Sequence, residues 1–567
     1  MKKLLSMLLA LLFQATGAHA VPAEPGLWRT LTITDGTTIE ALLTGDEHTH
    51  YWLGTNGLAY RAVAGSDDQL FETVDIGALS RQSLSHQQRI NEQRQRRLRR
   101  NVVGDRTNYS GQKRGLVVLV EFSDTKFQTS HNRALYQNIC NQQGYTSTEG
   151  FKGSVRDYFS AQSYGAFDLT FDVVGPVNVG KSYRYYGEND DNGYDLYPGE
   201  LTAAVCQTVD SQVNFANYDW DGDKEVDQVM IIYAGRGEAD GGGSYTIWPH
   251  EWTLTESDYG RKLQLDGVSI DTYAMANELR QSGINGIGTI CHEFSHCLGL
   301  PDFYDTINNR NYGLGAWSLM SSGNYNGGSF VPASYTSYER YCCGWLKPTE
   351  LSANTSVSSM QPLSQSPEAY LISNEAYPDE FFLLENRQAD GWDARLPGRG
   401  LLVIHVDYDQ SIWDSNVVNS TLSASDARYY DVPANDHQRC TIVRASNQTG
   451  SNGIGDAYPY NGNNELTNTS TPAATLYHAN SDGKKLLNIR LQNISQQSDG
   501  TMSFRFYDTA ESGPLVNIRA PQHTVADRQE EEAAADTYHD LQGRRFTDGR
   551  QPTRHGVYII NGKKVIL

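Results

Sequence analysis

The sequence predicts an α+β protein, in which a domain with a mixed sheet and one buried helix precedes an all-β, sandwich-like region. Residues 115–122 form an unbroken apolar run of strand length, which is typical of a buried strand. Residues 287–298 instead repeat apolar side chains at helical spacing. Beyond residue 348, short strand-like stretches alternate with loops rich in Gly and Asn, and this pattern favours packed sheets.

The predicted helix carries the pattern His-Glu-x-x-His, with His292 and His296 four residues apart. Two imidazoles at this spacing point the same way and can bind one metal ion. The apolar residues of the helix occupy the opposite side, so the histidines are not core residues. Glu293 lies beside them, where it can take a proton from a metal-bound water.

Gly299 and Asp302 follow the histidine motif at set spacing. Gly299 can adopt a positive φ and turn the chain out of the helix, and Asp302 can then return an oxygen to the metal. Three protein ligands with an open fourth position are typical of a catalytic zinc site. We therefore expect His292, His296 and Asp302 to bind zinc. The catalytic base would be Glu293.

The chain has 567 residues, a formal net charge of −21 and a pI near 5.1. A protein this acidic is not expected to bind nucleic acid or an anionic membrane. The chain has seven cysteines, which is an odd number, and no Cys-x-x-Cys pair. No disulfide framework is therefore predicted. After the N-terminus no run approaches about twenty apolar residues, so no transmembrane helix is expected.

Residues 219–227 place carboxylates at alternate positions around a glycine. This arrangement resembles the first half of an EF-hand loop, whose oxygens bind calcium. The second half does not match, because Met230 stands where the last glutamate ligand would be. Calcium binding and a simple acidic turn are therefore both open. The candidate calcium ligands are Asp219, Asp221, Asp223, Glu225 and Asp227.

The stretch from His292 to Asp305 reads H-E-x-x-H-x-x-G-x-P-D-x-Y-D without a break, and Met320 follows in a turn rich in Gly and Ser. These features resemble the metzincin clan of zinc peptidases and, within it, the immune inhibitor A-like M6 family. The resemblance covers residues 113–350 of a predicted domain at 101–350. It implies a metzincin-like fold, protein or peptide substrates, and an apolar Met320 beneath the metal.

Two positions depart from the common metzincin pattern. Asp302 stands where most metzincins have a third histidine, although the M6 resemblance implies aspartate and zinc accepts it. Ser322 stands where some metzincins have a tyrosine two residues after the methionine. The candidate for oxyanion stabilisation is then Tyr325, farther along the chain.

Residues 1–20 have the three parts of a signal peptide, which are a basic start, an apolar run and small residues before the cleavage point. Residues 21–100 are predicted to be a pro-segment with small hairpins, ending in the basic run 94–100. That run is either a solvated linker or a site where a trypsin-like protease cuts.

A segment ahead of a peptidase domain often inhibits it, so this pro-segment is the expected inhibitor of a zymogen. It contains no cysteine, so a thiolate cannot be the group that blocks the zinc. The candidate blocking residues are Asp46, Glu47, His48 and His50.

Residues 351–510 are expected to form the β-sandwich-like accessory domain, whose segment Glu385-Asn386-Arg387 resembles one that accompanies M6 peptidases. Residues 511–567 comprise a linker and a tail that resembles the C-terminal sorting domains of type IX-secreted proteins. The tail implies passage through an outer membrane, followed by release or attachment at the cell surface. One extra β-hairpin is the alternative.

The sequence thus predicts a secreted or surface-associated, monomeric zinc endopeptidase, with calcium as a candidate second ion. The alternatives are a catalytically silent surface adhesin or binding protein on a peptidase scaffold, and an enzyme for a non-protein amide. The intact set of Glu293 and three metal ligands favours the peptidase.

Overall fold

The computed structural model describes most of the chain in two compact units, Met1–Ile518 and Arg519–Leu567. The described residues are 23–103, 106–191, 193–281, 283–307, 309–448, 453–508, 538–539, 557–560 and 563–566. The expected signal peptide at 1–20 lies outside them, as does most of the expected linker and tail at 511–567. No helix among the described residues is long and apolar enough to cross a membrane.

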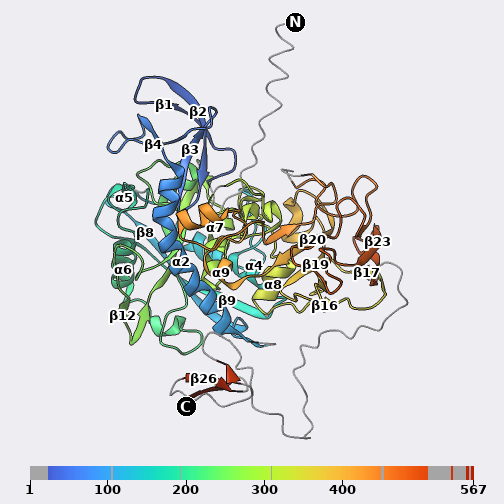
Figure 1. Ribbon diagram of the computed structural model, residues 1–567. Helices are drawn as coiled ribbons and strands as arrows, with labels where there is room; N and C mark the ends of the chain where they lie inside the picture. The colour runs from blue at the N-terminus through green and yellow to red at the C-terminus, as the bar shows by residue number, and fades with distance from the viewer. Residues whose placement is uncertain are drawn as a thin grey trace. The chain divides into compact units, whose positions relative to one another are not determined.

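Residues 23–103, called the N-terminal segment below, begin with a five-stranded antiparallel sheet and end with a long helix (Figure 1). The strands follow in the order β1 (Trp28–Thr32), β2 (Thr38–Gly45), β3 (His50–Gly54), β4 (Ala59–Ala62) and β5 (Phe71–Val74). Helix α2 (Ile76–Asn101) starts at Asp75, whose side chain accepts hydrogen bonds from two backbone N–H groups of its first turn. The predicted hairpins are therefore present. A short strand pair, β6 (Val102–Val103) and β7 (Arg106–Thr107), follows.

A mixed sheet in the order β11-β14-β10-β8-β9 forms the centre of the next part. Its strands are β8 (Gly111–Glu121), β9 (Phe167–Asn178), β10 (Val229–Arg236), β11 (His250–Thr253) and β14 (Thr272–Arg280), with β15 (Gly283–Ile284) beside β14. Strand β11 is antiparallel to β14 at the edge, whereas β14, β10, β8 and β9 are parallel. The apolar run in β8 is fully buried because helices cover both faces of the sheet.

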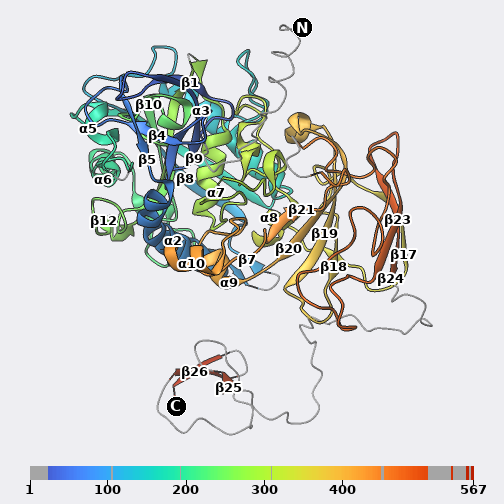
Figure 2. The same cartoon turned by 45° about the horizontal axis from the view of Figure 1, so that its top comes forward.

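Two apolar layers, one on each face, hold these helices to the sheet. Helices α3 (Arg133–Asn141), α4 (Val155–Gln162) and α7 (Gly288–Cys297) share one layer with Val117 and Leu119 of β8. Helices α5 (Tyr183–Gly187) and α6 (Pro198–Val209) flank the other face, where Leu116 and Val118 lie (Figure 2). The alternation along β8 therefore separates the helices into two groups and places α7 on one face.

The remaining elements of this part are short. They are β12 (Leu263–Leu265), β13 (Val268–Ile270), α8 (Ser337–Cys342) and the 3-10 helices η1 (Phe215–Tyr218), η2 (Glu238–Asp240), η3 (Gly315–Trp317) and η4 (Ser322–Tyr325). All seven cysteines are unpaired.

Residues 349–508 contain two sheets. The first has the order β16 (Thr349–Glu350), β18 (Ala369–Ser373), β19 (Glu380–Arg387), β20 (Gly400–Asp407), β21 (Cys440–Ile442). The second has the order β17 (Thr355–Met360), β24 (Met502–Asp508), β23 (Ile489–Gln496), β22 (Leu466–Thr467). Phe382 of β19 and Phe504 of β24 belong to the apolar core between the two sheets. Leu383, on the other face of β19, joins the core that contains α7.

This region is not all-β, contrary to the sequence prediction. Helices α9 (Gln410–Asp414) and α10 (Ala424–Tyr430) interrupt it, together with the 3-10 helix η5 (Gly391–Arg395). Asp409 and Ser423 cap the two α-helices by accepting hydrogen bonds from backbone N–H groups of their first turns. In the second compact unit, β25 (Tyr538–His539), β26 (Val557–Ile560) and β27 (Lys563–Ile566) form an antiparallel sheet.

Arg387 links the first of these sheets to the loops that follow α7. The side chain is fully buried and pairs with Glu385 at 2.9 Å and Asp393 at 2.7 Å. It also donates to the carbonyl oxygens of Trp317 (3.1 Å) and Ser334 (3.3 Å). Arg387 therefore neutralises two buried carboxylates and joins two parts of the chain.

We expect Arg387→Met to lower the free energy of unfolding by about 3–5 kcal/mol, because it leaves two buried carboxylates without their cation. Urea denaturation followed by tryptophan fluorescence would measure this. The exposed Arg428, which has only a 3.4 Å bond to a backbone oxygen, provides the control, and Arg428→Met should change stability by less than about 0.5 kcal/mol. Equal effects of the two substitutions would contradict this role of Arg387.

Candidate active site

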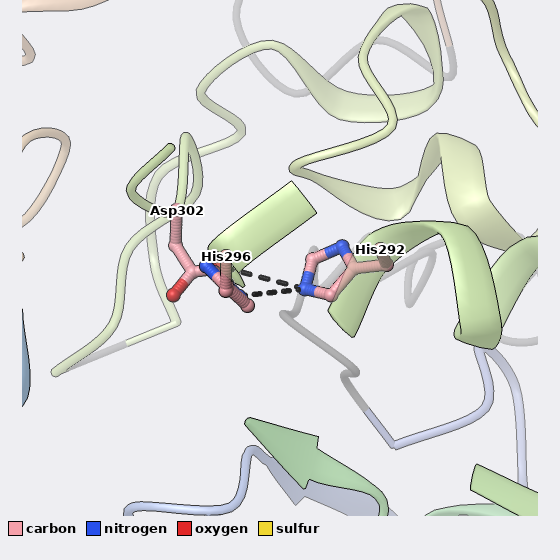
Figure 3. Close-up of side chains that lie close together, drawn as sticks. All are labelled: His292, His296 and Asp302. Carbon is pink, nitrogen blue, oxygen red and sulfur yellow. Dashed lines mark hydrogen bonds and ion pairs between the residues drawn. The ribbon is translucent and has the colours of Figure 1, made fainter. Parts of the chain in front are cut away.

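Helix α7 brings the histidine pair to Asp302, as the spacing predicted (Figure 3). The Nε2 atoms of His292 and His296 are 3.2 Å apart. The Oδ1 atom of Asp302 is 3.5 Å from His292 Nε2 and 3.3 Å from His296 Nε2. All three side chains are fully buried. Three donor atoms therefore converge on one point, as metal binding requires.

Backbone carbonyls fix the orientation of both imidazoles. His292 Nδ1 donates to the oxygen of Leu319, and His296 Nδ1 donates to the oxygen of Leu300, each at 2.8 Å. With the proton on Nδ1, each ring directs the lone pair of Nε2 toward Asp302. Both rings are therefore set in the tautomer that a metal ligand needs.

Asn416 holds the third candidate ligand from a distant part of the chain. Its side-chain amide donates to Asp302 Oδ2 at 2.9 Å and accepts from the Asp302 N–H at 3.0 Å. These two bonds leave Oδ1 of Asp302 free to face the histidines. Sequence analysis missed Asn416, which lies 114 residues after Asp302 and carries no local motif.

Gly299 turns the chain from α7 toward Asp302 with φ of +98°. A Cβ at this position would lie 2.5 Å from the backbone oxygen of Arg94. Both observations require glycine, so the predicted role of Gly299 in the turn is confirmed.

The carboxylate oxygens that face this point lack hydrogen bonds to the described residues. Both carboxylate oxygens of Glu293 and Oδ1 of Asp302 are buried without a hydrogen bond to any described residue. Burial raises the pKa of Glu293 to about 8. Burial would also raise the pKa of Asp302, but His296 and His292 hold it well below its usual range. Two imidazole nitrogens and an ionised carboxylate are a donor set that fits zinc.

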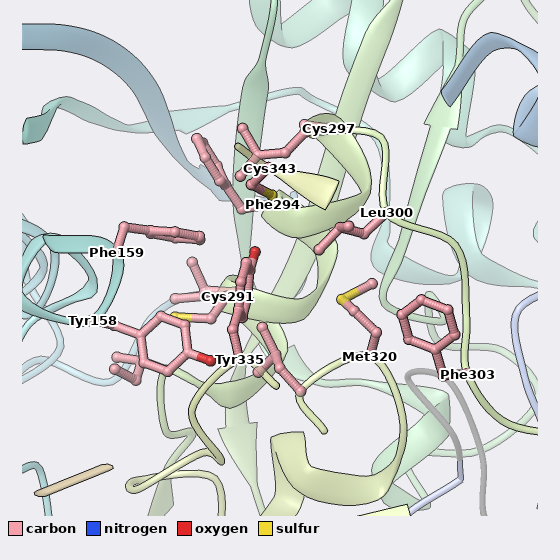
Figure 4. Packing of buried hydrophobic residues seen from close by; sticks show 14 of the residues in the cluster. Tyr158, Phe159, Cys291, Phe294, Cys297, Leu300, Phe303, Met320, Tyr335 and Cys343 are labelled. Atoms are coloured by element: carbon pink, nitrogen blue, oxygen red, sulfur yellow. The ribbon is translucent and has the colours of Figure 1, made fainter. Parts of the chain in front are cut away.

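Met320 lies beside Phe303 in the apolar surroundings of the site (Figure 4). Its backbone oxygen accepts from the Phe303 N–H at 2.8 Å, and its N–H donates to Glu339 at 3.3 Å. The preceding residue, Leu319, is the one that orients His292. The turn around Met320 thus fixes both the chain after Asp302 and one imidazole.

The acidic stretch 219–227 brings together three of its five candidate ligands. Carboxylate oxygens of Asp219, Asp221 and Asp227 lie within 4.8 Å of one another. Asp223 and Glu225 are turned to other partners, which are Arg100 and Lys262. Burial raises the pKa of Asp227 to about 7. The loop therefore gathers a cluster of three carboxylates, fewer than the five candidate ligands.

A turn of the N-terminal segment reaches the histidine site. Asp46 accepts a hydrogen bond from Tyr304 at 3.2 Å. Glu47 and His48 are buried, and their side chains have no hydrogen bond to any described residue. Burial first, and then the charges of Asp46, Asp302 and Glu293, raise the pKa of Glu47 well above its usual range. Glu47 therefore lies within electrostatic reach of the candidate metal ligands.

His50, the fourth candidate blocking residue, has other partners. Its ring is stacked on Trp248 at 4.2 Å, and its Nε2 lies 3.4 Å from Glu238. Its Nδ1 donates to the backbone oxygen of Asp46 at 3.0 Å, so His50 supports the turn that carries Asp46, Glu47 and His48 while its Nε2 faces Glu238.

Helix α2 covers the end of α7. The Arg94 guanidinium lies between two carboxylates, with Nε 2.7 Å from Glu251 and Nη1 4.0 Å from Asp302. Arg97 donates to the oxygen of Cys297, the last residue of α7, at 2.9 Å. A positive charge at this position also suits the negative end of the α7 dipole. The N-terminal segment thus closes over the site with complementary charge.

Comparison with known proteins shows which family of enzymes this part of the chain resembles. Residues 105–347 match the family model of the immune inhibitor A peptidase M6, catalytic domain. The chain therefore carries a domain similar to M6 metallopeptidases. The resemblance read from the stretch between His292 and Asp305 is confirmed for this part.

Two relatives support the similarity to M6 metallopeptidases. Over 292 residues the chain is 27% identical to the pre-pro-metalloprotease PrtV of Vibrio cholerae serotype O1, covering 43% of this chain and 32% of that protein. Over 261 residues it is 30% identical to immune inhibitor A of Bacillus thuringiensis subsp. alesti, covering 37% of this chain and 36% of that protein. The chain thus spans about a third of the length of these relatives.

Proposed function

We propose that this protein is a secreted zinc-dependent endopeptidase, made as a zymogen, that hydrolyses protein or peptide substrates. The observation that carries this is the convergence of His292, His296 and Asp302 beside Glu293, which is buried and has no hydrogen bond from its carboxylate to any residue that the structure describes. It lies within the part of the chain that is similar to M6 metallopeptidases. Secretion rests on the signal-peptide pattern of residues 1–20.

The three metal ligands and Glu293 would have separate roles in the reaction. A zinc ion held by His292, His296 and Asp302 would polarise the scissile carbonyl and acidify the attacking water. Glu293 would take the proton of that water and deliver it to the leaving amine. Both of its carboxylate oxygens are buried and have no hydrogen bond to a described residue, so they are available to the attacking water.

Tyr325 is the proposed donor to the oxyanion. Its ring is buried in a small apolar cluster with Leu43 of the N-terminal segment and Trp248. Removal of that segment would uncover it. Tyr325→Phe should then lower kcat about 10²-fold with little change in KM, and an unchanged kcat would exclude the role.

We propose that the N-terminal segment is the inhibitor. Asp46, Glu47 and His48 are brought to the site by a buried turn, and Arg94 contacts the surroundings of Asp302. A substrate chain cannot occupy this space while the segment is bound. Glu47 and His48 are the strongest candidates for blocking the metal, because both side chains are buried beside the site and pair only with each other, at 3.3 Å, among the ion pairs of the described residues.

Digestion of casein by the extracellular protein, with and without a chelator, tests the peptidase function. Cleavage that stops with chelator and returns with zinc is expected. The rival function, a silent adhesin on a peptidase scaffold, predicts no cleavage under either condition. The complete set of ligands and base weighs against that rival.

We also propose that Asp219, Asp221 and Asp227 bind calcium once Arg100 leaves Asp221, to which it is now paired at 2.9 Å. In the extracellular form, calcium at about 100 times its Kd should stabilise the fold by about 2.7 kcal/mol. Thermal unfolding with and without calcium would measure this.

Two variants sharpen the calcium test. Asp227→Asn should lose the calcium-dependent rise in Tm. Glu225→Gln should keep it, because Glu225 pairs with Lys262 outside the cluster of three. A rise in Tm that survives in Asp227→Asn would show that calcium binds elsewhere.

A further inference from the structure

The N-terminal segment neutralises a buried carboxylate beside the candidate metal site. The positive charge that it supplies there indicates the charge that a substrate must supply. We propose that Glu251 selects substrates with an Arg or Lys side chain close to the scissile bond, and that Arg94 now occupies the place of that side chain. The proposal rests on the peptidase function proposed above.

Glu251 lies on the edge strand β11 and is fully buried. Its register partner in β14 is Ala274, which belongs to the same apolar core as Phe294 of α7. Glu251 therefore points to the face of the sheet on which α7 carries the candidate metal ligands.

Among the described residues, both cations that pair with this carboxylate come from helix α2. Arg94 Nε donates to Oε2 at 2.7 Å, and Arg97 Nη1 lies 3.9 Å from Oε1. Oε1 has no hydrogen bond to any described residue. No arginine, lysine or histidine of the peptidase domain forms an ion pair with Glu251 in the part of the chain that the structure describes.

The same guanidinium reaches the metal-binding residues. Arg94 Nη1 is 4.0 Å from Oδ2 of Asp302 while Nε holds Glu251. A cation at this position therefore lies directly beside the atoms that would act on a peptide bond. A substrate side chain that replaced it would belong to a residue near that bond.

Removal of α2 would take both cationic partners away from Glu251, whose carboxylate would then face the space that Arg94 had filled. Such an unpaired charge is costly. The guanidinium of a substrate arginine, or the ammonium of a substrate lysine, would restore the lost ion pair. A neutral side chain of the same size would leave the carboxylate unpaired. Selection of this kind discriminates strongly between substrates, because only a substrate without the positive charge leaves the Glu251 carboxylate unpaired.

The neighbouring cavity has the same sign of charge. It has a volume of about 290 Å³ and lies between the N-terminal segment and the peptidase domain. On the peptidase side, Asp190, Asp195, Glu256 and Asp258 line it. No lysine or arginine is among the described residues of its wall. Its wall on β11 is formed by His250 and Trp252, which alternate with Glu251, so this cavity adds acidic surface near the edge strand and is not the space that Arg94 fills.

The experiment uses the extracellular form, whose N-terminus is established by sequencing. Casein cleavage sites are identified by mass spectrometry, and peptide pairs that differ only in arginine or citrulline are built on the preferred site. We expect kcat/KM to be at least about tenfold higher for the arginine peptide, because a charged partner is replaced by a neutral one. In Glu251→Gln this ratio should fall toward one.

Two further variants complete the design. Glu251→Asp keeps the charge and should retain part of the preference. Glu149→Gln is the matched control, because Glu149 is exposed in the same domain and does not line the acidic cavity, and it should keep the wild-type ratio. Ratios are compared within each variant, so a general loss of activity cancels.

Several results would overturn the proposal. Equal cleavage of the two peptides by the wild-type protein is one, and it needs no variant to fold. An unchanged ratio in Glu251→Gln is another, as is a secreted form that retains Arg94. In each of these cases casein would still be cut and the peptidase function would stand. Uncut casein would instead remove the proposed function, and this inference with it.

Discussion

Glu293→Gln is expected to slow hydrolysis of casein by about 10²–10⁴-fold or more while zinc remains bound. The substitution keeps the shape of the side chain and removes its ability to take a proton. His292, His296 and Asp302 are untouched, so the donor set for the metal is complete. Activity and zinc content of the same preparation, measured together, separate loss of the base from loss of the metal.

The control for this variant is Glu149→Gln, at an exposed position in the same domain. It should leave both activity and zinc content unchanged. Casein hydrolysis at the wild-type rate by Glu293→Gln would show that Glu293 is not the base. Loss of zinc from Glu293→Gln would show that it acts as a ligand.

Full-length protein with an intact N-terminal segment is expected to be at least about a hundredfold less active than the cleaved form. The segment is linked to the domain, so it acts at an effective concentration in the mM range. Its turn at 46–48 and Arg94 fill the space beside Asp302. A quenched casein assay before and after removal of the segment would measure the ratio.

Variants of the uncut chain would identify the blocking group. Glu47→Ala or His48→Ala should raise its activity, because each removes a buried side chain that now lies at the site. Glu72→Ala is the control, because Glu72 lies on β5 of the same segment and its side chain is 45% exposed. An uncut chain as active as the cleaved form would contradict the proposed inhibition.

The core of the candidate site was predictable because it is local. His292 and His296 are one helical turn apart, so their convergence follows from helix geometry alone. The turn toward Asp302 followed from a glycine, and the structure gives that glycine a φ of +98°. These features depend on residues within a few positions of one another.

The surroundings of the site were not predictable because they depend on distant residues. Asn416 lies 114 residues from Asp302, and Glu251 is paired with an arginine 157 residues before it. No periodicity or spacing in the sequence encodes such pairs. The acidic loop shows the same limit, since Arg100 and Lys262 draw Asp223 and Glu225 out of the predicted calcium set.

The two helices in the C-terminal region were missed for a different reason. Helix α9 has five residues and α10 has seven, so neither is long enough to show a clear apolar period. Such short helices are not stable alone and depend on their caps and on tertiary packing. Ser423 with Asp426 forms a capping box, which was the available signal for α10.

Metal analysis of the extracellular protein tests the central claim most directly. The account predicts one zinc ion per chain in the wild-type protein and in Glu293→Gln, and loss of that zinc in His292→Ala and in Asp302→Ala. Circular dichroism would show that each variant is folded. A folded His292→Ala or Asp302→Ala protein that keeps a full equivalent of zinc and still digests casein would contradict it.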